Sequence, residues 1–294
     1  MSADTVSYLG AGPTAIRHHY DVGNAFWRMW LDPTMTYSCA MWRDPDEDLE
    51  LAQIRKLDHH IEQARAHGAG RVLDVGCGWG SMLSRLVREH GVPHAVGLTL
   101  SEEQLAHVRE SAPPGVEVRL QSWDSYVAPE PFDAVISVGA FEHFARQGLG
   151  PEGQIQAYRR FFSACRDWLK PGGRLSLQTI AYGDVPRDRP LRDRFIVDEI
   201  FPESELPRLA DIALAAEMLF EIELVRNDRD DYVRTLRAWF SRLRERRAEV
   251  VAASSEEIVA RYERYLRTFA YSMELGAFTL LRLTMRRIDL PGRW

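Results

Sequence analysis

A glycine-rich turn between an apolar strand and a helix constrains the fold of this 294-residue chain more than any other feature. The run RVLDVGCGWG ends an apolar segment on Gly76, Gly78 and Gly80, and the residues after it repeat apolar side chains at helical spacing. Glycine permits a tight turn and a close approach of ligand to backbone, and the first N–H groups of the following helix point at that ligand. The order of strand, glycine turn and helix therefore predicts a nucleotide or adenosyl site.

The same alternation of strands and helices continues along the chain. Helices are expected between most of the strands, including 233–247 and 255–271. This pattern predicts an α/β fold, namely a Rossmann-like, seven-stranded, mostly parallel doubly wound sheet. The further strands are expected in AVGLTL, VEVRLQ, FDAVISVGAF, RLSLQTI, FEIELVRND and GAFTLLRLTMRRI.

The chain is expected to divide into a lid and a core. Residues 1–66 are predicted to form a helical N-terminal lid, and residues 67–294 the ligand-binding core, with a cap inserted at about 181–218 where the alternation breaks. Such a cap would cover the edge at which open α/β sheets bind ligands. The lid is rich in aromatic residues, and the sequence leaves two places open for its tryptophans, a packed lid core or a substrate wall: Trp27, Trp30 and Trp42.

Composition excludes several classes of protein. A formal net charge of −6 argues against a nucleic-acid partner, because phosphate backbones are bound by clustered positive charge. The cysteines Cys39, Cys77 and Cys165 form no CxxC pair, so neither a disulfide framework nor a metal site is expected. No apolar run is long enough to span a bilayer and no secretory leader is recognisable, which predicts a cytoplasmic protein.

Two features select the ligand of the glycine turn. A dinucleotide fold prefers GxGxxG and an acidic residue at the end of the second strand, whereas this chain has GxGxG and ends that strand on Thr99 and Leu100. Asp74 instead precedes the turn, where a carboxylate can face an amine or a cation. No phosphate-binding lysine is nearby, so S-adenosylmethionine is favoured over NAD or ATP.

Five ordered motifs now make the sequence recognisable. Together they resemble the mycolic acid cyclopropane synthase and cyclopropane fatty acid synthase family of S-adenosylmethionine-dependent methyltransferases, over about residues 18–285. The motifs are HYDVGNAFWRMWLDPTMTYSCAMW, VLDVGCGWG, VGLTLSEEQLAHV, ISVGAFEHF and FIVDEIFPESELP.

The resemblance implies a set of cofactor-binding residues. Within it, Gln104 would bind the ribose hydroxyls in place of the usual acidic residue, and Trp123 would cover the adenine. Without the resemblance, Gln104 would be expected on a solvated helix face and Trp123 in the core. The full implied set is Tyr37, Ser38, Asp74, Gly76, Gly78, Gly80, Thr99, Leu100, Gln104, Trp123 and Asp124.

The resemblance also implies the reaction. The family transfers a methyl group to a carbon–carbon double bond, which leaves a carbocation that loses a proton to close a cyclopropane, and a bound bicarbonate is the implied base. Aromatic faces and fixed negative charge stabilise such a cation. The implied surroundings are Cys39, the backbone near Val138, Glu142 and Tyr232, with Glu142 as the principal catalytic residue. Its alternative is a carboxylate that only faces a helix dipole.

The acceptor half departs from the family pattern at two positions. The family strand commonly reads LHTI, whereas this chain reads LQTI and places Gln178 where a histidine would help to hold the anion. Phe269 stands where the mycolic acid enzymes have a cysteine. Glutamine still donates a hydrogen bond but carries no charge and shuttles no proton. We therefore expect methyl transfer to be retained, with a change in the acceptor or in the fate of the cation.

Weaker signals leave alternatives open. The adjacent His59 and His60 point in different directions on a helix and are expected on a solvated face rather than as metal ligands. The run NDRDDY, with Asp228, Asp230 and Asp231, is expected to be a solvated loop rather than a magnesium site. The arginines of 234–247 are compatible with transient contact with a membrane or an acidic carrier protein.

Three functions follow from these patterns. The first is a cyclopropane-synthase-type methyltransferase with an apolar, lipid-like acceptor. The second is a small-molecule C- or N-methyltransferase of natural-product metabolism, and the third a catalytically silent module that only binds the cofactor.

Overall fold

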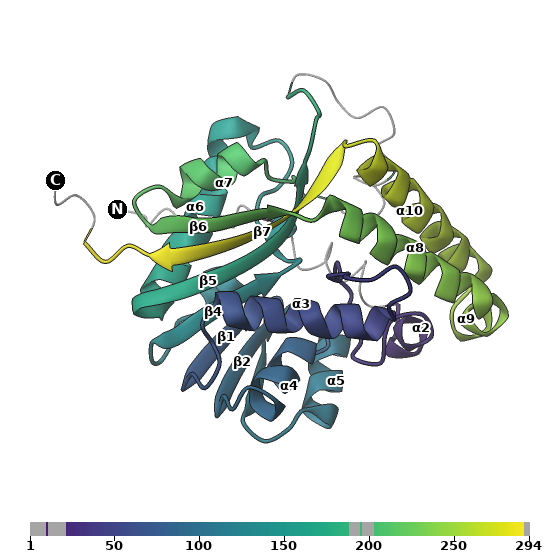
Figure 1. The fold of residues 1–294 in the computed structure, drawn as a ribbon, viewed down its shortest axis with the longest axis horizontal. Helices are drawn as coiled ribbons and strands as arrows, with labels where there is room; N and C mark the ends of the chain where they lie inside the picture. The colour runs from purple at the N-terminus through teal and green to yellow at the C-terminus, as the bar shows by residue number, and fades with distance from the viewer. Residues whose placement is uncertain (1–9, 11–21, 188–194, 196–202, 291–294) are drawn as a thin grey trace, which may run out of the picture.

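A single seven-stranded sheet organises the protein. The computed structural model describes residues 10, 22–187, 195 and 203–290. Within them the strands lie in the order β3-β2-β1-β4-β5-β7-β6 (Figure 1). Their bounds are β1 Arg71–Val75, β2 His94–Thr99, β3 Val116–Leu120, β4 Phe132–Val138, β5 Leu169–Tyr182, β6 Phe220–Asn227 and β7 Phe278–Arg287.

The direction of the strands confirms the predicted fold class. The pairs β1–β2, β2–β3, β1–β4 and β4–β5 are parallel, and β7 runs antiparallel to both β5 and β6. Strand β1 pairs with β2 on one side and β4 on the other, so the chain order reverses at β1. Ligands bind beside the carboxyl ends of the strands at such a reversal.

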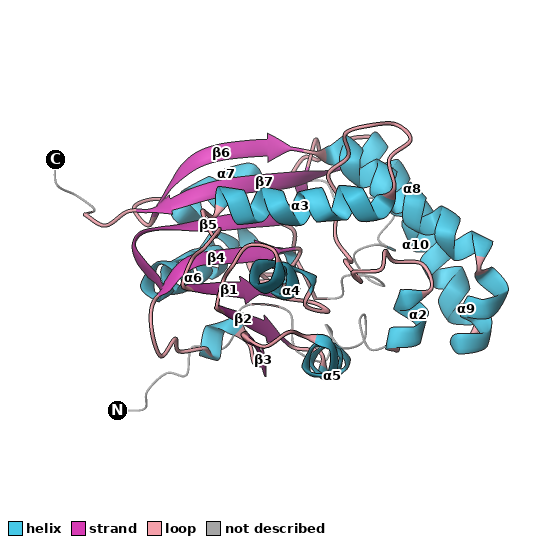
Figure 2. Ribbon diagram, turned by 60° about the horizontal axis from the view of Figure 1, so that its bottom comes forward, coloured by secondary structure: helices cyan, strands magenta, loops and turns pink. Residues whose placement is uncertain are grey.

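Helices cover both faces of the sheet (Figures 1 and 2). The helices α3 (Leu49–Gln63), α4 (Ser81–Arg88) and α5 (Glu102–Ser111) lie on one face, and α6 (Gly150–Trp168) and α7 (Leu209–Ala216) on the other. Side-chain caps begin two of them: Asp48 accepts from the backbone N–H of Glu50 in α3, and Ser101 accepts from that of Gln104 in α5.

A second group of helices gathers at the carboxyl ends of the strands (Figure 2). It comprises α2 (Asn24–Arg28), α8 (Arg229–Glu245), α9 (Arg247–Ala253) and α10 (Glu256–Glu274). Fully buried aromatic rings join its distant parts, since Trp30 lies 5.1 Å from Trp27 and 6.1 Å from Trp239 between ring centroids. We call this group of helices, α2 and α8 to α10, the cover. Trp27 and Trp30 therefore belong to the core of the cover. Trp42 is half-buried and donates a 3.0 Å hydrogen bond to Thr235 Oγ1.

The described parts of the predicted lid and cap each contribute to more than one layer of the fold. Helix α3 lies on the sheet, whereas α2 joins the cover, so residues 22–66 serve two layers. Much of the predicted cap at 181–218 lies outside the described residues. Its described helix α7 packs against α6 on a face of the sheet, because its buried side chains Ile212 and Ala215 join the core there. Among the described residues, α2 and α8 to α10 build the cover at the carboxyl edge, and Tyr182, Phe195 and Leu206 of the predicted cap pack against its core.

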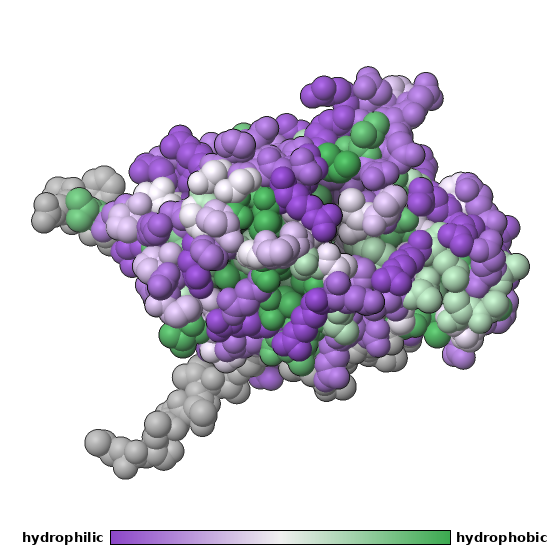
Figure 3. All heavy atoms as spheres, turned by 90° about the horizontal axis from the view of Figure 1, so that it is seen from below, coloured by the Kyte–Doolittle hydropathy of each residue, from purple (hydrophilic) through white to green (hydrophobic). Residues whose placement is uncertain are grey.

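The surface carries both polar and apolar patches. The face shown in Figure 3 is mostly hydrophilic with scattered apolar patches, including a mildly apolar one at the end of the molecule that holds α2 and α9. Among the described residues, no helix combines the length and apolarity needed to cross a membrane.

Candidate active site

The glycine turn depends on backbone geometry that other residues disfavour. Gly76, Gly78 and Gly80 have φ values of 83°, 54° and 82°. The backbone N–H groups of Gly76 and Cys77 both donate to the carbonyl of Leu98, at 3.0 and 2.9 Å. A Cβ atom on Gly76 would lie 2.4 Å from the Cβ of Ala140. The turn therefore brings β1, β2 and the segment after β4 into contact at one point.

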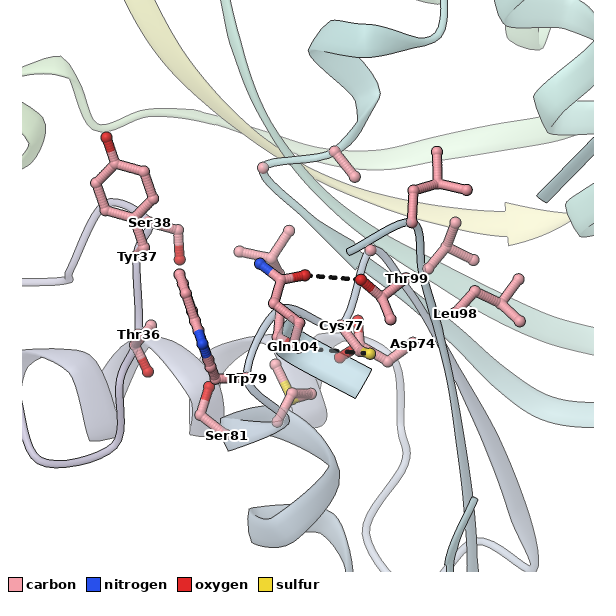
Figure 4. A pocket seen from close by; sticks show the side chains of 18 of the residues that line it. Thr36, Tyr37, Ser38, Asp74, Cys77, Trp79, Ser81, Leu98, Thr99 and Gln104 are labelled. Atoms are coloured by element: carbon pink, nitrogen blue, oxygen red, sulfur yellow. Dashed lines mark hydrogen bonds between the residues drawn. The ribbon is translucent and has the colours of Figure 1, made fainter. Parts of the chain in front are cut away.

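A cavity of about 130 Å³ opens beside this turn (Figure 4). In Figure 4, the segment with Tyr37 and Ser38 stands opposite Thr99, with the glycine turn between them. Most of the predicted cofactor residues line the cavity, namely Tyr37, Ser38, Asp74, Gly76, Gly78, Thr99, Leu100, Gln104 and Trp123.

Two predicted cofactor residues lie elsewhere. Gly80 is the N-cap of α4 and packs on α5, where an added Cβ would meet Val108 Cγ2 at 2.9 Å. Asp124 is exposed and is absent from the lining of the cavity, because the short helical turn Trp123–Ser125 directs Trp123 inward and its neighbour outward. Ser122 and Gln121 line the cavity from this segment instead.

Gln104 and Trp123 are both buried, and both line the cavity. Gln104 is buried, and Thr99 Oγ1 donates a 2.7 Å hydrogen bond to its Oε1, which leaves the amide N–H groups for a hydroxyl acceptor. Trp123 is buried against Phe144 and Phe161, at ring-centroid distances of 5.2 and 5.3 Å. Gln104 therefore does not lie on a solvated helix face, and Trp123 does not pack in the core alone, because both side chains line the cavity.

The cavity is also lined by residues that the sequence did not predict there, namely Lys56, Trp79 and His143. Trp79 Nε1 donates to Asn24 Oδ1 at 2.7 Å, which ties the glycine turn to α2. His143 lies 2.7 Å from Ser204 Oγ through Nδ1, and burial lowers the pKa of His143 to about 4, so this imidazole is neutral at pH 7. Lys56, in α3, is fully buried and lines the cavity. Its place among Gln53, Leu57 and His60 on the buried stripe of α3 was the signal available in the sequence.

A second, smaller cavity of about 20 Å³ adjoins the first. It shares Tyr37, Ser38 and Gly139 with the cofactor cavity. The structure brings all the residues predicted for the acceptor side together around it: Cys39, Glu142, Gln178 and Tyr232. The catalytic and cofactor assignments thus occupy neighbouring spaces.

Glu142 is the distinctive charged group of the small cavity. It lies in the short turn Phe141–His143 after β4, and its side chain is buried. Oε1 accepts a 2.6 Å hydrogen bond from the backbone N–H of Ile180, whereas Oε2 is buried with no hydrogen-bond partner among the described residues. Burial raises the pKa of Glu142 to about 7. The carboxyl group can therefore change protonation state near neutral pH.

Aromatic side chains enclose the other side of this cavity. Tyr265 is buried and hydrogen-bonded to Tyr37 and Tyr232, and burial raises its pKa. The ring of Phe269 stacks on Tyr265 at 5.6 Å and meets Tyr232 edge-on at 5.6 Å. Phe269 therefore supports the tyrosines from behind and does not line the cavity.

Gln178 is held by a buried polar network that the sequence did not reveal. Arg282 Nε donates to Gln178 Oε1 at 2.9 Å, and His60 Nε2 lies 3.4 Å from the same oxygen. His60 Nδ1 lies 2.8 Å from Ser176 Oγ. The expectation of a solvated His60 is wrong, because α3 packs this face on β5 and leaves the imidazole fully buried.

Arg282 extends this network to the loop that carries Cys39. Its guanidinium donates to the carbonyls of Cys39 and Ala40, at 3.2 and 3.0 Å, and pairs with Asp228. Asp228 is thus a partner of a buried cation at the start of α8, which corrects the expectation of a solvated loop there. Burial raises the pKa of the Cys39 thiol to about 12, so this side chain is neutral at physiological pH.

Fold and site together define the class of this protein. Three features characterise an S-adenosylmethionine-dependent methyltransferase. The sheet is mostly parallel with an antiparallel β7, the GxGxG turn lies against a cavity, and the amide of Gln104 lines that cavity, whereas dinucleotide folds use an acidic side chain for the ribose.

Comparison with known proteins identifies the family. A family model described as mycolic acid cyclopropane synthetase matches residues 11–283. Cyclopropane mycolic acid synthase 2 of Mycobacterium bovis is 36% identical over 269 residues, which cover 86% of this chain and 87% of that protein. The chain belongs to the mycolic acid cyclopropane synthetase family and is an enzyme of the cyclopropane synthase type.

Solved structures agree with this assignment. The cyclopropane synthase MmaA2 from Mycobacterium tuberculosis has a TM-score of 0.84 at 32% identity, covering 96% of this chain and 100% of that one. Mycolic acid cyclopropane synthase CmaA1, complexed with SAH and CTAB, gives the same TM-score, identity and coverage. Coclaurine N-methyltransferase has a TM-score of 0.79 at 20% identity, covering 96% of this chain and 84% of that one, which shows a shared fold alone. The small-molecule methyltransferase alternative is therefore not favoured.

Proposed function

We propose that the enzyme transfers the methyl group of S-adenosylmethionine to an alkene carbon of a lipid-like acceptor. The observation that carries the proposal concerns Oε2 of Glu142, which is buried and has no hydrogen-bond partner among the described residues. It lies at a cavity that shares Tyr37, Ser38 and Gly139 with the cofactor cavity. A neutral acceptor gains positive charge when it is methylated. A carboxylate held without a counter-ion at that place stabilises the charge.

The residues around the small cavity have complementary roles in this proposal. The rings of Tyr37, Tyr232 and Tyr265 line it and offer aromatic faces to a cationic carbon. Glu142 supplies fixed negative charge and stands beside the position from which a proton must leave. Gln178 presents amide N–H groups, because Arg282 already donates to its oxygen.

Bicarbonate fits the small cavity as a bound base. About 10–15 Å³ accommodates one water, so a cavity of about 20 Å³ has room for a small group such as this anion. The groups that would hold it are the side chains of Cys39, Glu142, Gln178 and Tyr232. When bound, bicarbonate would supply a proton acceptor.

The relatives support a lipid-like acceptor. The proteins named above are cyclopropane mycolic acid synthases, and CmaA1 was solved with CTAB, a ligand with a long alkyl chain. Contact with a membrane or an acidic carrier has less support from the described residues, because the arginines predicted for it are engaged within the chain. Their partners are Trp42 for Arg234, Glu274 for Arg237, the carbonyls of Trp30 and Leu31 for Arg242, Glu263 for Arg244, Glu249 for Arg246, and Glu256 for Arg247.

Deuterium counting tests the proposal directly. The enzyme is incubated with S-adenosylmethionine carrying a trideuterated methyl group and with phospholipids whose acyl chains are monounsaturated, or saturated as the matched control. Mass spectrometry should show label in the unsaturated chains only. Two retained deuterium atoms show ring closure by loss from the methyl group, and three show methylation with proton loss from the acceptor. Label in neither lipid contradicts the lipid-like acceptor.

A further inference from the structure

Lys56 is an unusual residue in this protein. The chain has 37 basic Lys and Arg residues, and Lys56 and Lys170 are its lysines. Lys170 is about half exposed at the start of β5, whereas Lys56 has no exposed surface at all. Lysine is almost never fully buried unless it is paired with a negative group. The burial of Lys56 therefore calls for a ligand or a partner.

Within the part of the chain that the structure describes, no carboxylate forms an ion pair with this ammonium group. Nζ donates a 2.7 Å hydrogen bond to Ser38 Oγ, and no carboxylate oxygen of the described residues lies within 4 Å of it. The charged and titratable groups that face it at longer range are Arg282 on β7, Asp32 and Cys39 in the loop after α2, Asp74 on β1, and His60 one turn along α3. An ammonium group has three N–H donors, so donors remain beyond the one that Ser38 accepts.

Lys56, Ser38 and Asp74 all line the cofactor cavity. Asp74 is 2% exposed, and its side chain makes no hydrogen bond to another described residue. A buried cation and a buried carboxylate that do not pair with each other, and that open into the same cavity, are complementary to a ligand carrying both charges. The methionine end of S-adenosylmethionine carries an α-carboxylate and an α-ammonium group.

We infer that Lys56, together with Ser38, binds the α-carboxylate of the methionine end of S-adenosylmethionine. Asp74 faces the α-ammonium group of the same end. Lys56 is then the residue by which the site distinguishes the complete cofactor from adenosyl thioethers that lack the amino acid. The inference rests on the cofactor site and is independent of the acceptor chemistry proposed above.

The electrostatics of the site are consistent with this role. Burial, with Arg282, lowers the pKa of Lys56 to about 7, and burial raises the pKa of Asp74 to about 7. At pH 7 both groups are therefore near the midpoint of their titration. A bound carboxylate favours the ammonium form and raises the pKa of Lys56, and a bound ammonium group lowers that of Asp74.

Nuclear magnetic resonance can observe this lysine almost in isolation. Lysine labelled with carbon-13 at Cε should give signals from Lys56 and Lys170, and Lys170→Arg assigns them. The pKa of Lys56 is measured alone, with S-adenosylhomocysteine, and with 5′-methylthioadenosine, which lacks the amino acid. We expect S-adenosylhomocysteine to raise the pKa of Lys56 by about one unit or more, and 5′-methylthioadenosine to leave it near its starting value. A pKa that S-adenosylhomocysteine does not raise overturns the inference.

Binding affinities supply the second measurement. In isothermal titration calorimetry, Lys56→Met should weaken S-adenosylhomocysteine by about 10-fold or more and change 5′-methylthioadenosine by less than about 2-fold. Lys170→Met, at a site outside the cavity, is the matched control and should change neither. Equal weakening of both ligands would show that Lys56 only supports the fold, against the inference. Because no acceptor is present, failure here leaves the proposed function standing, and the titration of the unmutated lysine remains decisive if Lys56→Met does not fold.

Discussion

The side-chain nitrogen Nε of Arg282 donates a 2.9 Å hydrogen bond to Oε1 of Gln178. Arginine has only donors, so this contact determines which way the amide of Gln178 is oriented. Its oxygen faces β7 and its N–H groups remain for the small cavity that Gln178 lines. The position at which the family commonly has a histidine is thus filled by an oriented hydrogen-bond donor, with the buried imidazole of His60 behind it.

Replacing Gln178 by Leu should remove that donor while leaving the volume of the side chain similar. We expect kcat to fall by about 10-fold or more, because an anionic or reacting group in the cavity loses a hydrogen bond. Affinity for S-adenosylhomocysteine should remain within about 2-fold. Steady-state kinetics and calorimetry check both values, and a combined loss of cofactor affinity would contradict the division into two cavities. Gln178→His, the residue common in the family, should retain more activity than Gln178→Leu.

Arg282→Met should destabilise the protein, because it leaves Asp228, Gln178 and two backbone carbonyls without their buried donor. Breaking a buried ion pair by removing one partner costs about 3–5 kcal/mol. Urea unfolding should show this loss in the free energy of unfolding. Arg286→Met removes an exposed arginine of the same strand that pairs with Glu221, and should cost less than about 1 kcal/mol. Similar losses for the two variants would refute the structural role of Arg282.

Glu142→Gln should lower kcat by about 100-fold or more, since the variant carries no charge beside the acceptor. Because the pKa of Glu142 is raised to about 7 by burial, kcat of the unmodified enzyme should rise with pH through about 7, and that of the variant should not. Affinity for S-adenosylhomocysteine serves as the control and should be preserved. A variant with unchanged turnover would exclude Glu142 from catalysis.

The same carboxyl group should affect stability with the opposite pH dependence. Its folded-state pKa lies above its unfolded value, so ionisation is easier in the unfolded chain, and stability is lost as pH rises from about 4.5 to about 7. Glu142→Gln lacks this loss. Between pH 4 and pH 8, the free energy of unfolding of the variant should therefore gain about 3 kcal/mol relative to the unmodified protein. Urea unfolding at the two pH values measures the difference, and a constant difference would contradict the raised pKa.

Gly76→Ala should weaken cofactor binding and stability together. The added methyl group would meet Ala140 at 2.4 Å in a residue with φ of 83°. Gly68→Ala is the matched control, because Gly68 also has a positive φ but an added Cβ there has no atom within 4 Å. The control should pay only the backbone cost of about 1–2 kcal/mol. Calorimetry with S-adenosylhomocysteine should separate the two, and equal affinity in both variants would show that the contact with Ala140 is unimportant.

The sequence by itself determined much of the fold and predicted most of the named residues that line the larger cavity. The alternation of strands and helices and the glycine turn are local patterns, so they can be recognised from neighbouring residues without knowledge of distant contacts. They correctly indicated the mostly parallel sheet and a cavity beside Gly76 and Gly78. Asp124 was carried over from the resemblance, and the direction of a single short turn placed it outside the cavity.

The tertiary structure decided which polar residues are buried together. His60, Lys56, Gln178 and Arg282 lie on α3, β5 and β7, and nothing in their local sequence states that these elements pack face to face. The sequence could not reveal this network for a physical reason. Burial changes the pKa and the hydrogen bonding of a polar side chain only when elements distant in the sequence pack over it and exclude water. The glycine turn therefore indicated where the larger cavity lies, and the packing of α3 on the sheet determined which buried charges line it.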